Sequence, residues 1–449
     1  MTDDQGVAVN RRRFLTISGS VLGGIAVGTT VTAAESDERF LVETNDVGGL
    51  DAEVIHDLSQ INLAVVRGNE EDLEADSSAS TFEPDTVYQL DLPSERQDEF
   101  AAPEGGVDIQ DAEDALLYPA QWDKQAQDIP AAHDITEGEG TRVSIIDTGI
   151  GTFFGDDVFH PDLTVNTDLS KNFTEDSGDA GDIGFHGTHV AGTVGANGLG
   201  VTGTAPETEL VSCRVFGNAG GATFGTVVAA MVYSAEIGCD AANMSLGAYP
   251  VSREGLGDFY GKVLQKSANY ANKEGTLLVA AAGNDSADLQ HDGDVISLPN
   301  EAANVMSVSA TSTAGFDPLF GGEPDEPAET PTSYTNYGTN AVNVSAPGGD
   351  TRDDGSVFDW VLSTAPPLNI LLPYVYLAGT SMAAPQVAGA AALVKSENPG
   401  YNANQVRSVL ERTSIHPRDV PGDKPYHGRG HLNPDGALQT RGGGNGKGK

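Results

Sequence analysis

Nearly continuous apolar segments alternate with helix-like segments over most of the chain. The apolar segments, which predict strands, cover residues 142–147, 209–216, 241–246, 276–281, 305–310 and 341–346. The helix-like segments lie at residues 187–194, 224–237, 258–273, 380–397 and 404–411. Strands without polar alternation are typical of a parallel sheet covered by helices on both faces. The pattern therefore predicts an α/β domain over residues 119–440.

A smaller unit is predicted before this domain, at residues 36–95. Apolar runs at 39–42, 61–66 and 86–90 predict strands, and residues 70–75 predict a short helix. This mixture is typical of a small α+β domain. Residues 96–118 are polar and rich in glycine and acids, which predicts a linker with a processing site. Residues 441–449 predict a flexible Gly-rich tail.

Residues 1–34 have the pattern of an export signal. Arg11, Arg12 and Arg13 precede Phe14 and Leu15, a mild apolar stretch follows at 17–31, and small residues end the segment. The stretch is too short and too weakly apolar for a transmembrane helix. The segment resembles a twin-arginine translocation signal, so we expect a secreted protein with no membrane attachment once the signal is removed.

The charge balance indicates which classes of partner the chain can bind. The chain has 24 Lys and Arg residues against 66 Asp and Glu residues, a net charge of −42. Nucleic acid is excluded as a partner because its phosphates would be repelled. Acidic residues spread through the whole chain predict a carboxylate-rich surface that salt screens, and hence a halophilic source. Cys213 and Cys239 exclude a disulfide framework, and whether they pair is left open.

Three polar patterns mark candidate chemistry. Asp147 ends a predicted buried strand, His186 begins a helix of small residues, and Ser381 begins another such helix. A serine hydroxyl is a poor nucleophile unless a base takes its proton, and histidine is the usual base near neutral pH. An acid can fix the tautomer of that histidine, and a helix start offers unpaired N–H groups to a developing oxyanion.

The segments Asp147–Ile150, His186–Gly192 and Gly379–Pro385 resemble the three signature segments of subtilisin-like serine proteases. The order Asp, His, Ser is that of this family and not of chymotrypsin or the α/β-hydrolases. The resemblance covers residues 119–440, and residues 38–92 resemble the inhibitory propeptide. Within the family, the chain resembles the haloarchaeal secreted halolysins.

The resemblance implies a role for each matching residue. Ser381 is expected to be the nucleophile, His186 the general base, and Asp147 the residue that orients His186. Asn284, in the segment Val279–Asn284, is expected to supply an oxyanion donor. His189 is expected to be a packed structural histidine.

Substrate contacts are also implied by the resemblance. One set forms the walls of the primary specificity pocket, namely Ser245, Leu246, Gly247, Ala282 and Gly283, with Asp285 and Ser297 at its rim and base. A second set, Gly220, Gly221 and Ala222, is expected to pair with an extended substrate backbone. Phe224 is expected to line an apolar pocket further upstream. Apolar walls predict large apolar substrate side chains.

The chemistry needs no cofactor, but the family often binds structural Ca²⁺ through carboxylates and carbonyls. His160-Pro161-Asp162-Leu163 resembles the segment whose aspartate serves the high-affinity site, so Asp162 is the candidate metal ligand. The partner loop at 196–203 is shortened by about two residues relative to the family pattern. Residues 350–376 form an excursion just before Ser381, and whether it covers the cleft is left open.

Together these observations predict a secreted, halophilic, monomeric serine endopeptidase of polypeptides. We expect it to be made as a zymogen whose residues 36–95 act as an intramolecular inhibitor and are removed by self-processing. Two alternatives stay open. One is a narrow-specificity protease that processes exported proteins, and the other is a catalytically inactive binding protein on the same scaffold.

Overall fold

The structure is a computed structural model, and it describes residues 35–89, 112–151, 160–218, 220–318, 322–324, 328–351, 356–366, 373–416 and 424–439. The expected signal at 1–34, most of the expected linker at 96–118, and the expected tail at 441–449 lie outside the described residues. Those three expectations stay predictions.

A largely parallel sheet forms the centre of the large domain. Its order is β14-β13-β11-β9-β5-β7-β6, and β15 also pairs with β13. The strands are β5 (Arg142–Asp147), β6 (Lys171–Asn172), β7 (Glu209–Arg214), β9 (Ala241–Met244), β11 (Leu277–Ala281), β13 (Val305–Ser312), β14 (Thr330–Pro331) and β15 (Val344–Pro347). All of these pairings are parallel except that of β13 with the edge strand β14. Each predicted strand of this domain is present.

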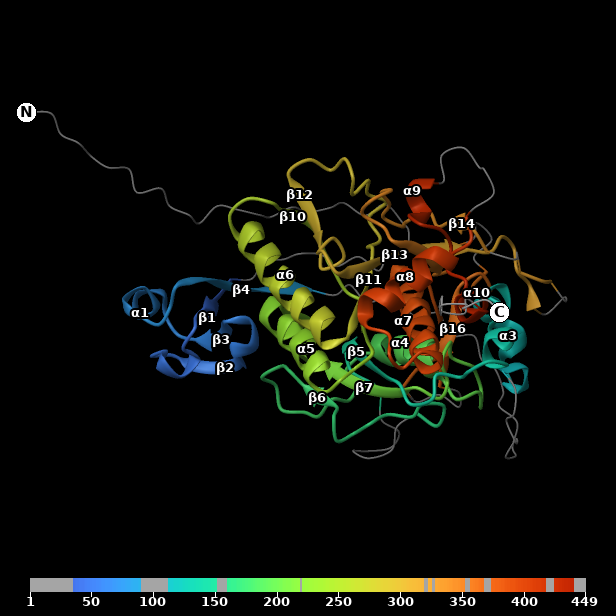
Figure 1. Ribbon diagram of the computed structural model, residues 1–449, viewed down its shortest axis with the longest axis horizontal. Helices are drawn as coiled ribbons and strands as arrows, with labels where there is room; N and C mark the ends of the chain where they lie inside the picture. Colours follow the sequence, from blue (N-terminus) through green and yellow to red (C-terminus); the bar gives the residue numbers. More distant parts are fainter. Residues whose placement is uncertain are drawn as a thin grey trace, which may run out of the picture.

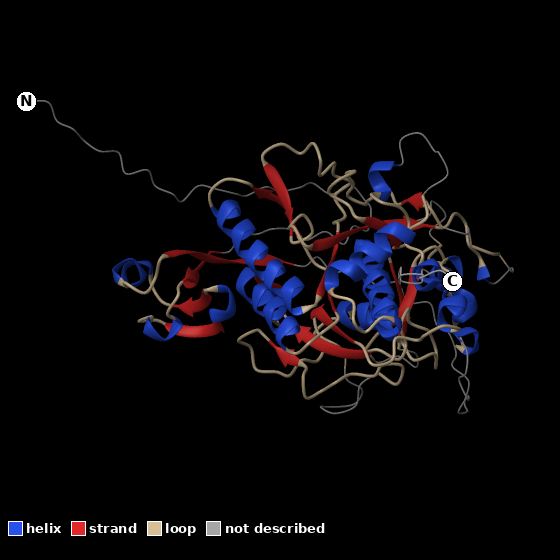
Figure 2. Cartoon of the chain, in the orientation of Figure 1, coloured by secondary structure: helices blue, strands red, loops and turns tan. Residues whose placement is uncertain are grey.

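Helices cover both faces of the sheet (Figure 2). They are α2 (Trp122–Ala126), α3 (Ile129–His133), α4 (His186–Gly195), α5 (Phe224–Glu236), α6 (Leu256–Glu274), α7 (Thr380–Glu397), α8 (Ala403–Thr413), α9 (Lys424–His427) and α10 (Pro434–Gln439). Successive side chains of β11 point to opposite faces, as the strand geometry requires. Val279 packs in the core that contains α4 and α7, whereas Leu278 and Ala280 pack in the core that contains α5 and α6.

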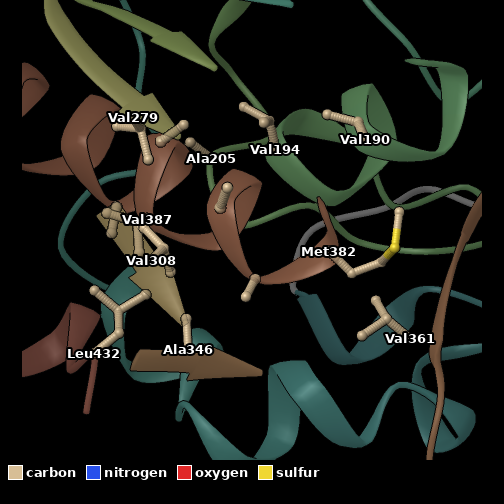
Figure 3. Close-up of a cluster of buried hydrophobic side chains, with 14 of the residues drawn as sticks. Val190, Val194, Ala205, Val279, Val308, Ala346, Val361, Met382, Val387 and Leu432 are labelled. Carbon is tan, nitrogen blue, oxygen red and sulfur yellow. The ribbon is translucent and has the colours of Figure 1, made fainter. Parts of the chain in front are cut away.

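The core around α7 is built from small residues. Met382 and Val387 of α7 lie among Val190 of α4 and Val279 and Val308 of the sheet (Figure 3). Every residue of α7 from Thr380 to Val394 is buried. A helix that is apolar on all sides must be surrounded by protein, and here the start of that helix is held rigidly in the middle of the domain.

The small unit at the N-terminus is an antiparallel sheet with one short helix. It contains β1 (Glu35–Glu43), β2 (Glu53–Leu58), β3 (Leu63–Arg67), β4 (Thr81–Gln89) and α1 (Glu70–Ala75), in the sheet order β2-β3-β1-β4. Leu41 and Val65 face the core shared with α5 and α6, while Phe40 and Val66 face a separate small core with Leu73 of α1. The unit therefore packs against α5 and α6 (Figure 1). The predicted fold class is confirmed.

The described part of the 350–376 excursion packs against α4, and whether the excursion covers the cleft stays open. β16 (Val361–Thr364) and β17 (Tyr374–Leu377) form an antiparallel hairpin. Ser363 Oγ donates to His189 O at 2.9 Å and Thr364 Oγ1 donates to Thr188 O at 2.7 Å. These hydroxyls satisfy carbonyls of α4, so this part is a buried support of that helix.

Two further strands, β10 (Ala248–Ser252) and β12 (Val295–Leu298), pair with each other beside the main sheet. Within the part of the chain that the structure describes, no helix combines the length and the apolar character needed to cross a bilayer.

Candidate active site

Asp147 and His186 meet at the carboxyl edge of the sheet. Asp147 is the last residue of β5 and His186 is the first residue of α4. The His186 Nδ1 atom lies 2.8 Å from Asp147 Oδ1, and both side chains are fully buried. Thr148 N also donates to Asp147 Oδ1, at 2.7 Å. A carboxylate in this position holds the ring with its proton on Nδ1, which leaves Nε2 as the acceptor.

The electrostatics of the pair favour a protonated ring. Burial alone would lower the pKa of His186, but the Asp147 carboxylate raises it above the usual value, with a smaller contribution from Asp182. Within the described residues, His186 Nε2 and Asp147 Oδ2 are buried without a hydrogen-bond partner. Buried polar atoms are rarely left unpaired, so Nε2 is available to take a proton.

Asp182 is a site residue whose role the sequence did not reveal. Its Oδ1 accepts from Thr148 Oγ1 at 2.7 Å, and its Oδ2 accepts from Thr188 N at 2.9 Å. It therefore caps the first turn of α4 and fixes the residue that follows Asp147. In the sequence, this role could have been found from the position of Asp182, four residues before His186, where a helix is predicted to begin.

Ser381 is the second residue of α7, where N–H groups have no partner within the helix. Its hydroxyl donates to Ser245 O at 3.3 Å, while Ser245 Oγ donates back to Ser381 O at 2.7 Å. Asn243 Nδ2 holds the Ser245 hydroxyl in turn, at 2.9 Å. Among the described residues, the Ser381 hydroxyl is thus held by this one long contact, and hydrogen bonds in a free active site are often of this kind.

The Asn284 side chain is oriented by the residue before Ser381. Its Oδ1 accepts from Thr380 N at 2.9 Å and from Thr380 Oγ1 at 2.8 Å. Because the oxygen is held in this way, the amide NH₂ group points to the other side. Asn284 Nδ2 lies 3.6 Å from the place where a Cβ on Gly379 would be. Sequence-distant segments therefore converge on the start of α7.

Two pockets share a wall next to this site. One is lined by Ser245, Ala281, Gly283, Asn284, Asp285, Ser297 and Ser381, and the other is apolar and is lined by Phe216, Ala222, Phe224, Val227, Leu264 and Pro299; Leu246, Gly247 and Ala248 line both. The expected pocket residues thus lie together, except that Ala282 does not line either pocket. The Asn300 and Asn336 side chains instead bind its carbonyl.

A sequence profile described as "Subtilase family" matches residues 138–444. The chain belongs to the subtilase family. It is 30% identical over 429 residues to "Alkaline protease" from Alkalihalobacillus alcalophilus, covering 94% of this chain and 97% of the relative. It is 30% identical over 329 residues to "Thermitase" from Thermoactinomyces vulgaris, covering 73% and 98%. This subtilase is therefore a subtilisin-type serine protease.

A solved structure gives the same fold over nearly the whole chain. It is the epidermin leader peptide processing serine protease from Staphylococcus aureus, with a TM-score of 0.69, 23% identity, and coverage of 90% of the subtilase and 99% of that chain. At this identity the similarity concerns the fold.

The expected substrate strand of the subtilase is already paired. β8 (Gly221–Thr223) pairs antiparallel with β4 of the N-terminal unit, with Tyr88 opposite Ala222 and Gln89 opposite Gly221. Gly220 precedes β8 with a φ of +81°, a conformation that favours glycine. Residues 220–222 and Phe224 therefore lie where an extended chain adds to the sheet edge.

The remaining candidates do not join the site. His189 is buried and its Nε2 lies 3.1 Å from Val361 O and 3.2 Å from Val375 O; burial lowers its pKa to about 3, which confirms a structural histidine. Cys213 and Cys239 are buried free thiols. Asp162 is fully buried and accepts a hydrogen bond from the Tyr374 hydroxyl at 2.9 Å. Among the described residues, no group of three His, Cys, Asp or Glu side chains is arranged to hold a metal ion.

Proposed function

We propose that this subtilase is an endopeptidase in which Ser381 attacks the carbonyl carbon of a peptide bond. The Ser381 hydroxyl proton passes to His186 Nε2 as the Oγ–C bond forms. His186 then gives this proton to the amine as the C–N bond breaks, and water hydrolyses the acyl-enzyme by the same steps. The observation that carries the proposal is the 2.8 Å contact between Asp147 Oδ1 and His186 Nδ1, together with the unpartnered Nε2.

Asn284 and the start of α7 would stabilise the oxyanion. Thr380 holds the amide oxygen of Asn284, so the NH₂ group is directed away from Thr380. Donors fixed before the reaction need not reorganise when the negative charge develops, which is why they lower the barrier.

The substrate is expected to be an extended polypeptide with apolar side chains at two positions. Its backbone would pair with β8, and the two pockets would take its side chains. The apolar pocket at Phe224 and the pocket at Ser381 share residues 246–248 as a wall, which suits side chains that project from one extended strand.

We further propose that the N-terminal unit is an inhibitory propeptide. β4 fills the edge of β8, so a substrate strand and β4 compete for the same backbone groups. The docking is supported by Asp85, which is fully buried, accepts from Gly225 N at the start of α5 at 2.7 Å, and pairs with Arg39 at 3.0 Å. Self-cleavage in the linker would be needed to free the edge.

Export through the twin-arginine pathway, a monomeric state and a halophilic, halolysin-like character complete the proposal. They rest on residues 1–34 and on the net charge of −42. High salt would screen the repulsion between surface carboxylates.

Casein cleavage in molar KCl with calcium tests the proposal. We expect the wild type to cleave casein and to remove its own N-terminal unit. The Ser381→Ala chain should remain an uncut precursor, because loss of the nucleophile costs about 10⁶ in kcat in subtilisin itself. A folded and matured wild type without any cleavage would contradict the endopeptidase. A chain lacking residues 36–95 that folds unaided, and is not inhibited by the added segment, would contradict the propeptide.

A further inference from the structure

Three consecutive backbone N–H groups converge on the carboxylate of Asp162. Leu199 N donates to Oδ1 at 2.6 Å, and Gly200 N and Val201 N donate to Oδ2 at 2.9 and 3.0 Å. The Tyr374 hydroxyl also donates to Oδ2, at 2.9 Å. A carboxylate offers about four acceptor positions. These four donors therefore use most of the hydrogen-bonding capacity of a side chain that has no exposed surface.

The carbonyl groups of the same loop bind other parts of the chain. Gly200 O accepts from Leu117 N at 2.7 Å, and Thr202 O accepts from Gln121 Nε2 at 3.0 Å. Val201 O accepts from Gly198 N within the loop, at 3.1 Å. Calcium requires six to eight oxygen ligands at about 2.3–2.6 Å. Here the carboxylate faces the positive ends of N–H groups, which suit an anion and repel a cation.

The neighbouring side chains fill the remaining space. The His160 ring and the Tyr374 ring meet edge to face, with centroids 5.2 Å apart. His160 Nδ1 accepts from Asp162 N at 3.1 Å and Nε2 donates to Pro373 O at 2.9 Å, so its lone pair is engaged. A Cβ on Gly200 would lie 2.2 Å from the Tyr374 ring, which shows how closely the ring packs on the loop.

We infer that the 196–203 loop closes on Asp162 without a cation. The N–H groups of this loop and the Tyr374 hydroxyl bind the carboxylate in place of the calcium ion of the family site that the loop resembles. The loop that resembles the calcium loop is shortened, and its carbonyls at residues 200–202 accept hydrogen bonds from other groups of the chain. Asp162 is then a structural carboxylate that ties the loop to β17, the strand that leads to Ser381. This inference goes beyond the proposed function and does not rest on it.

Thermal unfolding with and without calcium tests this inference. The measurement uses the full chain carrying Ser381→Ala, which cannot digest itself, in KCl of fixed strength with either a chelator or millimolar CaCl₂. Asp162→Asn and Tyr374→Phe, each added to this background, should lower Tm by the same amount in both media. Any rise in Tm caused by calcium at other sites should be equal in all three chains. A calcium-induced rise that disappears with Asp162→Asn would overturn the inference.

Two variants, Tyr270→Phe and Tyr374→Phe, guard the test against a general effect of losing a hydroxyl and against a failure to fold. Tyr270→Phe removes a hydroxyl on a different helix, α6, and should leave Tm unchanged, which controls for the loss of a hydroxyl as such. If the Asp162→Asn chain does not fold, Tyr374→Phe decides alone, since it keeps the carboxylate and removes one donor. The inference then predicts a lower Tm that calcium does not restore. An unchanged Tm, or recovery in calcium, would contradict it.

Discussion

Asp147 and Asp162 are both aspartates with no exposed surface, but their surroundings differ in kind. Asp147 receives hydrogen bonds on one oxygen, from Thr148 N and the His186 ring, and its Oδ2 has no partner among the described residues. Asp162 receives four hydrogen bonds over both oxygens, three of them from backbone N–H groups.

The difference indicates that the Asp147 carboxylate acts on the charge of its neighbour, whereas the Asp162 carboxylate stabilises the fold. The partner of Asp147 is titratable, so a charge change on the ring changes the energy of the pair. The hydrogen-bond donors to Asp162 do not titrate near neutral pH. Burial alone does not distinguish the two residues, but the identity and number of their donors do.

Replacing each aspartate by asparagine tests this comparison most strongly. Asp147→Asn should lower kcat by about 10⁴, a size known from the equivalent change in a chymotrypsin-type triad and close to the cost of losing this aspartate in subtilisin, because the amide no longer stabilises the charged ring. Its unfolding free energy should change by less than about 1 kcal/mol, since Oδ1 still accepts both hydrogen bonds and a buried charge is removed. Peptide hydrolysis and denaturant unfolding measure the two quantities.

Asn284→Ala should lower kcat by about 10²–10³, again a size known from subtilisin, with KM nearly unchanged. The reason is that its NH₂ group would bind the oxyanion of the transition state and not the substrate carbonyl. Initial rates on a peptide p-nitroanilide give both constants. Asn284→Asp is the matched control, because it keeps the acceptor for Thr380 while removing the donor, and it should lose as much.

Asp162→Asn should show the opposite behaviour to Asp147→Asn. We expect a loss of about 3 kcal/mol in unfolding free energy, because the NH₂ group would face N–H donors and leave buried groups unpaired. The kcat of the folded fraction should stay within about threefold of the wild type. Denaturant unfolding in the Ser381→Ala background gives the first value. A stable Asp162→Asn chain with greatly reduced kcat would reverse the assignment of the two aspartates.

Asp182→Asn should have the smallest effect on activity, a shift of the pH profile. Asp182 contributes to the raised pKa of His186, and the ring must be neutral to act as a base. Activity is lost as the pH falls through that pKa, so removing the Asp182 charge should move the acid limb of kcat/KM to lower pH. A limb that moves to higher pH, or does not move, would contradict this role.

The sequence predicted the large domain well because its nearly continuous apolar strands alternate with helix-like segments. Among the residues of the site, Asp147, His186 and Ser381 could be named because each stands at the end of a predicted strand or the start of a predicted helix, whereas Asn284 was named from the family resemblance. Topology then brings those ends to one edge of the sheet.

Contacts between segments that lie far apart in the sequence could not be predicted from the sequence pattern. β2 was missed because most of its side chains are exposed or half-buried, so it lacks an apolar run. Asp182 looks like any other acid in a chain of net charge −42. The donors around Asp162 are mostly backbone N–H groups, which every residue except proline carries, so only the coordinates reveal their convergence.

Labelling of the matured enzyme with a fluorophosphonate, followed by peptide mapping, tests the central claim most directly. The probe phosphonylates a serine only where a base takes its proton. The account predicts one adduct, on Ser381, and its loss in a His186→Ala chain whose N-terminal unit has been removed in trans by the wild-type enzyme. An adduct on another serine, or undiminished labelling of Ser381 without His186, would contradict the proposed roles of these residues.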